Sequence, residues 1–167
     1  MRYAQITPFE VCNGKGAGVS LFVQGCRFHC KGCFNSDAWD FDGGKEWTNE
    51  VEDKFFDLID KPYIKRISIL GGEPLAEENL TRLYYLISSI KETYPNKKIW
   101  LYTGYTLEEL NKENIYRNDD RQLILKKCDV LVDGRFIESL RDITLQFRGS
   151  SNQNIWKKEN CSWVKIT

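Results

Sequence analysis

Short apolar runs alternate with amphipathic segments along most of this chain. A run of apolar residues bounded by turn-forming residues is typical of a buried strand. Four such runs occur, at residues 19–24, 64–70, 98–103 and 128–133. Between them, apolar residues recur at the spacing of a helix face. This spacing predicts a helix capped by Thr48 with Val51, Phe55, Leu58 and Ile59 on one face, a helix over 80–90 that ends before Pro95, and short helices at 106–110 and 121–127.

This order of strands and helices predicts an α/β fold with a mostly parallel sheet. Strands joined by helical crossovers of a dozen or more residues lie parallel, and their connections are right-handed. A closed barrel of eight β/α units needs about 250 residues, whereas this chain has 167. We therefore expect one domain, residues 1–167, built as an open, partial β/α barrel.

Four distinctive segments follow the predicted strands. They are the cysteine-rich loop 26–33, Gly71–Pro74, Thr103–Tyr105 and Asp133–Gly134. Ligands of parallel α/β folds bind at the carboxyl ends of the strands, where these segments should meet. The sequence therefore predicts that all four contribute to one site.

Composition and charge exclude several classes of partner. Lys plus Arg and Asp plus Glu both number 24, so the formal net charge is zero. Nothing in this balance indicates a surface for nucleic acid or anionic lipid. No apolar run approaches the length of a membrane span, and the first ten residues lack the apolar core of a signal peptide. We therefore expect a cytoplasmic protein that binds neither nucleic acid nor membrane.

Three of the six cysteines, Cys26, Cys30 and Cys33, fall within eight residues. A cubane iron–sulfur cluster has four irons, and a protein normally binds each with one thiolate. A loop that supplies three thiolates leaves one iron open to a small molecule. A reducing cytoplasm, and a chain long enough to bury a core of its own, both argue against disulfides.

Zinc is the other metal that this loop can bind, because thiolates at this spacing hold it readily. His29 or a distant cysteine would then complete the tetrahedron. His29 lies inside the gap between Cys26 and Cys30, where its ring cannot easily reach the metal, so we interpret it as a loop histidine. Cys128 falls in an apolar strand and is expected to be a core thiol. Cys12 and Cys161 are expected to play no part in the site.

A second motif, Gly71-Gly72-Glu73-Pro74, follows the strand predicted at 64–70. Two glycines let the backbone approach a ligand closely, and the carboxylate of Glu73 can accept hydrogen bonds from an ammonium group. The same residues also suit a simple turn into a helix, where Glu73 and Pro74 are favourable. The nearby cysteine loop favours the ligand-binding interpretation.

The chain resembles the radical S-adenosylmethionine (SAM) enzymes, whose signature is a C-x3-C-x2-C loop after the first strand and a Gly-Gly-Glu segment after the second. Within that superfamily it is similar to the activating proteins of anaerobic ribonucleoside-triphosphate reductase, which are glycyl-radical enzyme activases. The similarity extends over nearly the whole chain. The matching segments are 13–16, 21–26, 33–35, Trp39, 71–75, 102–105, 129–134 and 147–153. Many radical SAM enzymes have an aromatic residue before the third cysteine, whereas this subgroup tends to have glycine, here Gly32.

The resemblance implies a cofactor set and its ligands. Cys26, Cys30 and Cys33 would bind three irons of a [4Fe–4S] cluster, and the amino and carboxylate groups of SAM would bind the fourth. The methionine ammonium would be held by Glu73 and by the backbone of Gly71 and Gly72. The backbone from Gly32 to Phe34 would flank the adenine, with Phe34 as the candidate side chain that covers it. Thr103 would contact the ribose or cap a turn, and Asp133 would face the pocket or begin a turn.

The resemblance also implies a reaction and its partners. Reductive cleavage of SAM would give a 5′-deoxyadenosyl radical, which would take a hydrogen atom from a glycine of the anaerobic reductase. An electron donor such as flavodoxin would supply the electron. Gly149–Gln153 would be a surface loop or a dock for the glycine segment of the reductase. Two alternatives remain at this stage: a radical SAM enzyme acting on another protein or a small molecule, and a non-catalytic, zinc-stabilised interaction module.

Overall fold

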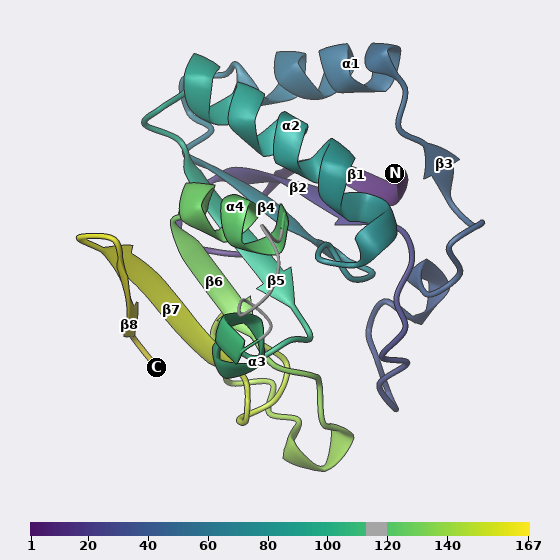
Figure 1. Ribbon diagram of the computed structural model, residues 1–167, viewed down its shortest axis with the longest axis vertical. Coiled ribbons are helices and arrows are strands. Elements are labelled where there is room, and N and C mark those ends of the chain that lie inside the picture. The colour runs from purple at the N-terminus through teal and green to yellow at the C-terminus, as the bar shows by residue number, and fades with distance from the viewer. Residues whose placement is uncertain (113–119) are drawn as a thin grey trace.

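Figure 1 shows the computed structural model of the chain, which describes residues 1–112 and 120–167. The strands within these ranges form one sheet, in the order β3-β1-β2-β4-β5-β6-β7-β8. Their bounds are β1 Arg2–Glu10, β2 Gly18–Val23, β3 Lys45–Glu46, β4 Arg66–Gly71, β5 Lys98–Thr103, β6 Val130–Asp133, β7 Asn154–Glu159 and β8 Ser162–Lys165. The α-helices are α1 Asn49–Ile59, α2 Glu77–Thr93, α3 Leu107–Lys112 and α4 Asp120–Lys127.

The predicted α/β order is confirmed for the centre of the molecule. Strands β2, β4, β5 and β6 are parallel neighbours, with α1 between β2 and β4 in sequence, α2 between β4 and β5, and α3 and α4 before β6. Thr48 caps α1 as expected, since its side chain accepts a hydrogen bond from the Val51 amide at 3.3 Å. None of the described helices is long and apolar enough to cross a membrane.

The expectation of a mostly parallel sheet holds only for those four strands. Strands β1 and β3 on one side, and β7 and β8 on the other, pair antiparallel. The described sheet is open, because its order runs from β3 to β8 without closing. The sequence analysis missed these flanking strands.

Irregularities in the flanking strands explain why the sequence pattern did not reveal them. The register of β1 against β2 shifts between Tyr3 and Gln5 and again between Thr7 and Glu10, and each shift breaks the two-residue alternation. Strands β7 and β8 are joined by a tight turn in which Asn160 and Cys161 have φ of 47° and 67°. Cysteine is not among the residues that signal such a turn.

The two faces of the central sheet differ in chemistry. One face is apolar and packs into the main core under α1, α2 and α4, which Figure 1 shows together on the same side of the sheet. Its buried residues are Val19, Leu21, Val23, Ile67, Ile69, Ile99, Leu101 and Leu131. The side chains of the other face are aligned across the four strands by register. One row is Ser20, Ser68, Trp100 and Val130, and the row nearer the carboxyl ends is Phe22, Leu70, Tyr102 and Val132.

A buried ion pair occupies the amino-terminal end of this second face. Arg66 is fully buried and donates from Nη1 to Glu10 Oε1 and to Ser68 Oγ, both at 2.6 Å. Burial alone would raise the pKa of Glu10, but hydrogen bonds from Arg66 and Ser20 outweigh it and lower the pKa. A Cβ on Gly18 would lie 2.5 Å from the Arg66 side chain. Glycine at this position therefore makes room for the guanidinium.

Candidate active site

A cavity of about 530 Å³ lies at the carboxyl ends of the parallel strands, within the size range of about 300–1,000 Å³ typical of ligand pockets. The aligned residues Phe22, Leu70, Tyr102 and Val132 contribute to its wall. Each of the four predicted segments also lines it, through Cys26, Cys30, Cys33, Gly71, Gly72, Glu73, Thr103, Gly104 and Gly134. The expected convergence of the four segments is therefore what the structure shows.

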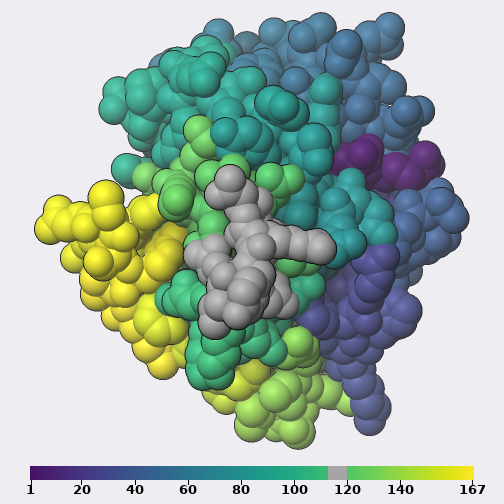
Figure 2. All heavy atoms as spheres, in the orientation of Figure 1, coloured from purple at the N-terminus to yellow at the C-terminus, as the bar shows by residue number. Residues whose placement is uncertain are grey.

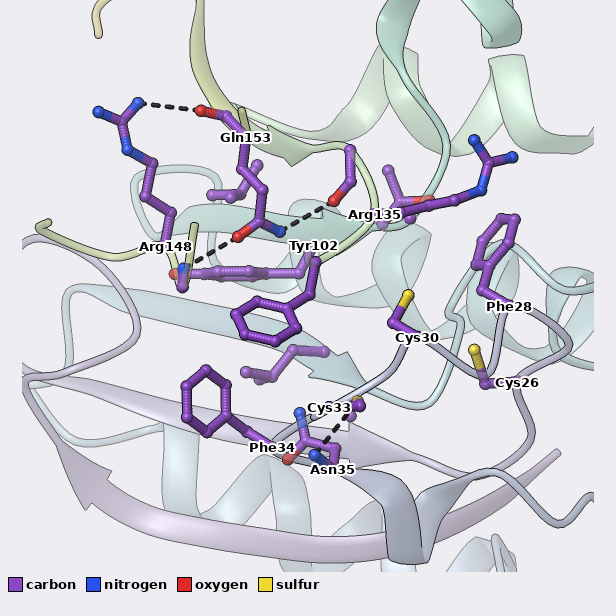
Figure 3. A pocket seen from close by; sticks show the side chains of 18 of the residues that line it. Cys26, Phe28, Cys30, Cys33, Phe34, Asn35, Tyr102, Arg135, Arg148 and Gln153 are labelled. Carbon is purple, nitrogen blue, oxygen red and sulfur yellow. Dashed lines mark hydrogen bonds between the residues drawn. The ribbon is translucent and has the colours of Figure 1, made fainter. Parts of the chain in front are cut away.

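The cysteine loop is held at its start by backbone hydrogen bonds. The amide of Gly25 donates to the Ala38 carbonyl at 2.8 Å, and the amide of Cys26 donates to the Trp39 carbonyl at 2.9 Å. Figure 3 shows Cys26, Cys30 and Cys33 gathered on one side of the pocket, and all three thiols are partly exposed. The Asn35 amide points at Cys33 Sγ, 3.4 Å away. Hydrogen bonds of this kind tune the potential of iron–sulfur clusters.

As they stand, the three thiols are not grouped around one point. Among the described residues, no three His, Cys, Asp or Glu side chains are grouped as ligands of a single ion. In a cubane each thiolate binds a different iron, so the thiols need not converge on one point. Burial raises the pKa of the Cys26 and Cys30 thiols. A raised pKa favours the neutral thiol, and binding of a metal centre would displace its proton.

The remaining sulfur and imidazole groups are placed much as the sequence suggested. The His29 ring stacks on Trp39, with centroids 4.5 Å apart, as expected of a loop histidine. Cys128 is buried in the core, where burial raises its pKa to about 12. Cys161 is exposed in the β7–β8 turn. Cys12 is also exposed, but it lines the cavity, which the sequence did not indicate.

Gly71 and Gly72 pack directly beneath the start of the cysteine loop. The Gly72 amide donates to the Val23 carbonyl at 2.8 Å, and the Glu73 amide donates to the Gly25 carbonyl at 2.7 Å. A Cβ on Gly72 would lie 2.5 Å from the Gly25 oxygen, and one on Gly71 would lie 2.8 Å from Phe22 Cα. These contacts are with backbone, which cannot move aside cheaply. Glycine is therefore required here by the approach of two backbone segments.

The Glu73 carboxylate is buried and accepts three hydrogen bonds from its own chain. Oε1 accepts from the Leu75 amide and the Thr103 hydroxyl, both at 2.8 Å, and Oε2 accepts from the Gly104 amide at 2.7 Å. Burial, opposed only in part by these bonds, raises the pKa of Glu73 to about 7. A carboxylate offers about four lone-pair sites. Within the described chain, Oε2 accepts one hydrogen bond and so has one lone-pair site left.

Sequence reasoning missed several residues that support this site. Asn79 is buried at the start of α2, and its Nδ2 donates to the carbonyls of Gln24 and Glu73 at 3.0 and 3.1 Å. The Trp39 Nε1 and Tyr102 hydroxyl atoms are buried, have no hydrogen-bond partner within the described chain, and belong to residues that line the cavity. Asn79 falls within a helical pattern and Tyr102 within a strand pattern, so neither was predicted as a site residue.

Gly32 and Phe34 lie toward the loop that follows β6. Gly32 has a φ of 71°, and a Cβ there would lie 2.8 Å from the Glu138 carboxylate; Gly32 is outside the cavity lining. Phe34 lines the cavity, yet 61% of it is exposed, and its ring packs against Phe136 at 5.2 Å. Glycine at position 32 is thus explained by its positive φ and by the close approach of the loop that follows β6.

The 149–153 segment holds the loop that follows β6 in place, and Asp133 joins two neighbouring elements. The buried carboxylate of Asp133 accepts hydrogen bonds from the Leu107 amide at 2.7 Å and from Asn154 Nδ2 at 2.9 Å. Asp133 lies outside the cavity lining, and these bonds join it to the start of α3 and to β7. In Gln153, Oε1 accepts from the amides of Gly149 and Ser150, and Nε2 donates to the Gly134 carbonyl at 2.9 Å. Figure 3 shows this side chain on the pocket wall.

Comparison with known proteins gives a consistent family. Residues 12–156 match the family described as a 4Fe-4S single cluster domain. This match favours an iron–sulfur centre over the zinc alternative.

Similar proteins share one name. The chain is 43% identical over 157 residues to the anaerobic ribonucleoside-triphosphate reductase-activating protein of Vibrio cholerae serotype O1, covering 93% of this chain and 97% of the relative. It is 38% identical to the Escherichia coli (strain K12) protein of that name, covering 92% and 96% of the two chains. The corresponding protein of Enterobacteria phage T4 is 34% identical, with 98% of each chain covered. The chain therefore belongs to the family of anaerobic ribonucleoside-triphosphate reductase-activating proteins.

Proposed function

We propose that this chain is the activase of an anaerobic ribonucleoside-triphosphate reductase and that it uses a [4Fe–4S] cluster and SAM to form a glycyl radical on that enzyme. The observation that carries the proposal is the opening of a three-thiol loop onto a cavity that also contains the Gly71–Glu73 segment. Family membership supplies the cluster domain and the class of partner. We further propose that residues 1–167 form a single radical SAM domain and that the open sheet is its partial barrel.

Cys26, Cys30 and Cys33 are proposed as the ligands of three irons. When bound, the cluster and SAM supply the one-electron reductive cleavage that yields a hydrogen-abstracting radical. Gly71 and Gly72 bring their backbone to the cavity, and Glu73 would accept the methionine ammonium on Oε2, where one lone-pair site remains. Because Glu73 is buried with a raised pKa, a cation beside it would stabilise the ionised form.

The adenine and ribose contacts are proposed for Cys33, Phe34 and Thr103. Cys33 and Phe34 line the cavity, and their backbone would flank the adenine, with Gly32 at positive φ just before them. Thr103 donates its hydroxyl proton to Glu73, so toward a ribose it would act as an acceptor. We propose that the reaction takes place in the cytoplasm and that a donor such as flavodoxin supplies the electron.

The first prediction concerns the cluster ligands. After anaerobic reconstitution the protein should contain about four irons and four sulfides per chain. Cys26→Ala, Cys30→Ala and Cys33→Ala should each abolish this cluster, because each removes the thiolate of one iron. Cys128→Ala, in the core, is the control and should retain it. Iron and sulfide analysis with the visible absorption spectrum makes the measurement, and stoichiometric zinc without iron would contradict the assignment.

The second prediction concerns the glycine beneath the cysteine loop. Gly72→Ala should lower stability by about 1–3 kcal/mol, because overpacking forces the backbone to shift. It should also reduce iron incorporation, although no thiol is changed, because the added Cβ displaces Gly25 next to Cys26. Thermal unfolding and iron content are measured beside Thr81→Ala, on the exposed side of α2. Equal iron content in the two variants would show that this backbone contact does not position the loop.

The third prediction concerns the SAM ammonium. Glu73→Gln should weaken SAM binding roughly ten- to a hundredfold, since a hydrogen bond to a charged group contributes about 1.5–3 kcal/mol. Iron content should stay unchanged. Glu78→Gln is the matched control, because that carboxylate lies outside the cavity lining and pairs with Arg27. Binding is followed by the change that SAM causes in the electron paramagnetic resonance spectrum of the reduced cluster. An unchanged spectrum with the unmodified protein would exclude SAM binding at an open iron.

The fourth prediction tests the function itself. With a reductant and SAM, the reconstituted protein should generate a glycyl radical on its cognate anaerobic reductase, with 5′-deoxyadenosine and methionine as products. The radical is read as its characteristic doublet in the electron paramagnetic resonance spectrum. Omission of SAM is the control. If SAM is cleaved but no radical forms on the reductase, the chain is a radical SAM enzyme with a different substrate.

A further inference from the structure

We infer that an apolar rim around the cavity mouth, formed by Phe34, Ile137, Leu140 and Ile143, is the surface on which the glycine-bearing segment of the reductase docks. The inference rests on the proposed function and assigns the residues that receive the protein substrate. The rim comes from two parts of the chain: the cysteine loop, which carries Phe34, and the segment 135–148 after β6, here called the lip.

The rim is unusually apolar for a surface loop. Exposed fractions are 87% for Ile143, 61% for Phe34, 42% for Ile137 and 41% for Leu140. Single exposed apolar side chains are normal, whereas a cluster of them marks an interaction site. Ile143 and Phe34 also line the cavity. The apolar surface is therefore continuous with the candidate active site.

The lip contains a turn held by hydrogen bonds, with Ile143 between the bonded residues. The carboxylate of Asp142 accepts hydrogen bonds from the Thr144 amide at 2.8 Å and from its hydroxyl at 2.7 Å. The Asp142 amide donates to the Gly149 carbonyl at 3.2 Å, and the backbones of Arg141 and Ser150 form an isolated antiparallel β-bridge. These bonds fix the backbone on both sides of Ile143. A preorganised apolar side chain loses little entropy when a partner covers it.

Contacts between the lip and the cysteine loop join the two parts of the rim. Phe34 packs against Phe136 at 5.2 Å, and the Arg141 guanidinium lies over the Phe34 ring, 5.0 Å from its centroid. Lys31 pairs with Glu138 at 3.1 Å. Figure 2 shows the lip (light green) projecting at the lower edge of the molecule, next to the cysteine loop (blue-violet). The rim is thus one surface beside the cluster ligands.

The size and position of the rim indicate its occupant. Ile137 and Leu140 are exposed but lie outside the cavity lining, so a small molecule inside the cavity does not cover them. The proposed reaction requires a glycine of a protein to enter the cavity, so the residues flanking that glycine must cross its mouth.

The test compares charged substitutions inside and outside the rim. Ile143→Asp and Leu140→Asp should each weaken binding of the reductase at least about tenfold and lower the yield of glycyl radical at subsaturating reductase. Leu140 is outside the cavity lining. The matched control is Val164→Asp on β8, with the same 41% exposure as Leu140; its reductase affinity should equal that of the unmodified protein.

Iron content and SAM affinity, measured on the same variants, separate this inference from the proposed function. Failure of the unmodified protein to form a glycyl radical would remove the proposed function. The docking inference fails if the unmodified protein is active and both rim variants bind the reductase normally. It also fails if the weaker reductase binding of the rim variants is matched by an equal loss of SAM affinity. It also fails if sedimentation shows that the substitutions dissociate a dimer of this chain while reductase affinity is unchanged, since the rim would then join two copies.

Discussion

The approach of the β4 end to the start of the cysteine loop is the contact on which the site depends. Two backbone hydrogen bonds, from Gly72 to Val23 and from Glu73 to Gly25, fasten the segment that leads into Cys26. They form only because neither Gly71 nor Gly72 has a side chain in the space between the strands. The Gly-Gly pair therefore positions the start of the cysteine loop as well as lining the cavity, and the cysteine loop and the proposed SAM-binding segment form one structural unit.

The second face of the central sheet, opposite the main core, is accessible only near the carboxyl ends of the strands. Side chains fill its amino-terminal end. Arg66 and Glu10 lie buried there as an ion pair, and Ser68 donates to the Asn13 carbonyl at 2.5 Å, which holds the segment before β2 across the sheet. Removing one partner of such a pair leaves an uncompensated buried charge. Arg66, Glu10 and Ser68 are outside the cavity lining, so the network fills the amino-terminal end of this face while the cavity lies at the carboxyl end beside the cysteine loop.

The sequence predicted the central strands and helices, and the segments that meet at the site, because these follow regular periodicities. It missed β1, whose register shifts break the alternation, and the β7–β8 hairpin, whose turn uses Cys161 at positive φ. It identified Glu73 but not its environment. That Thr103 and Gly104 donate to this carboxylate follows from the parallel arrangement of β4 and β5, which residue types alone do not reveal. Asn79 was hidden for the same reason, since its partners are carbonyls distant in sequence or in the preceding turn.

At Gly32 the cysteine loop and the lip approach each other closely. An aromatic residue here, as in many radical SAM enzymes, would have to adopt a φ of 71° and would meet the Glu138 carboxylate within 3 Å of its Cβ. Both are unfavourable for a bulky side chain. With glycine, Glu138 can reach Lys31, and Phe34 can pack against the lip at Phe136. Gly32 and the lip therefore depend on each other. The lip occupies the space that an aromatic side chain at position 32 would take. The exposed apolar residues of the lip, rather than an aromatic side chain at position 32, form that part of the cavity mouth.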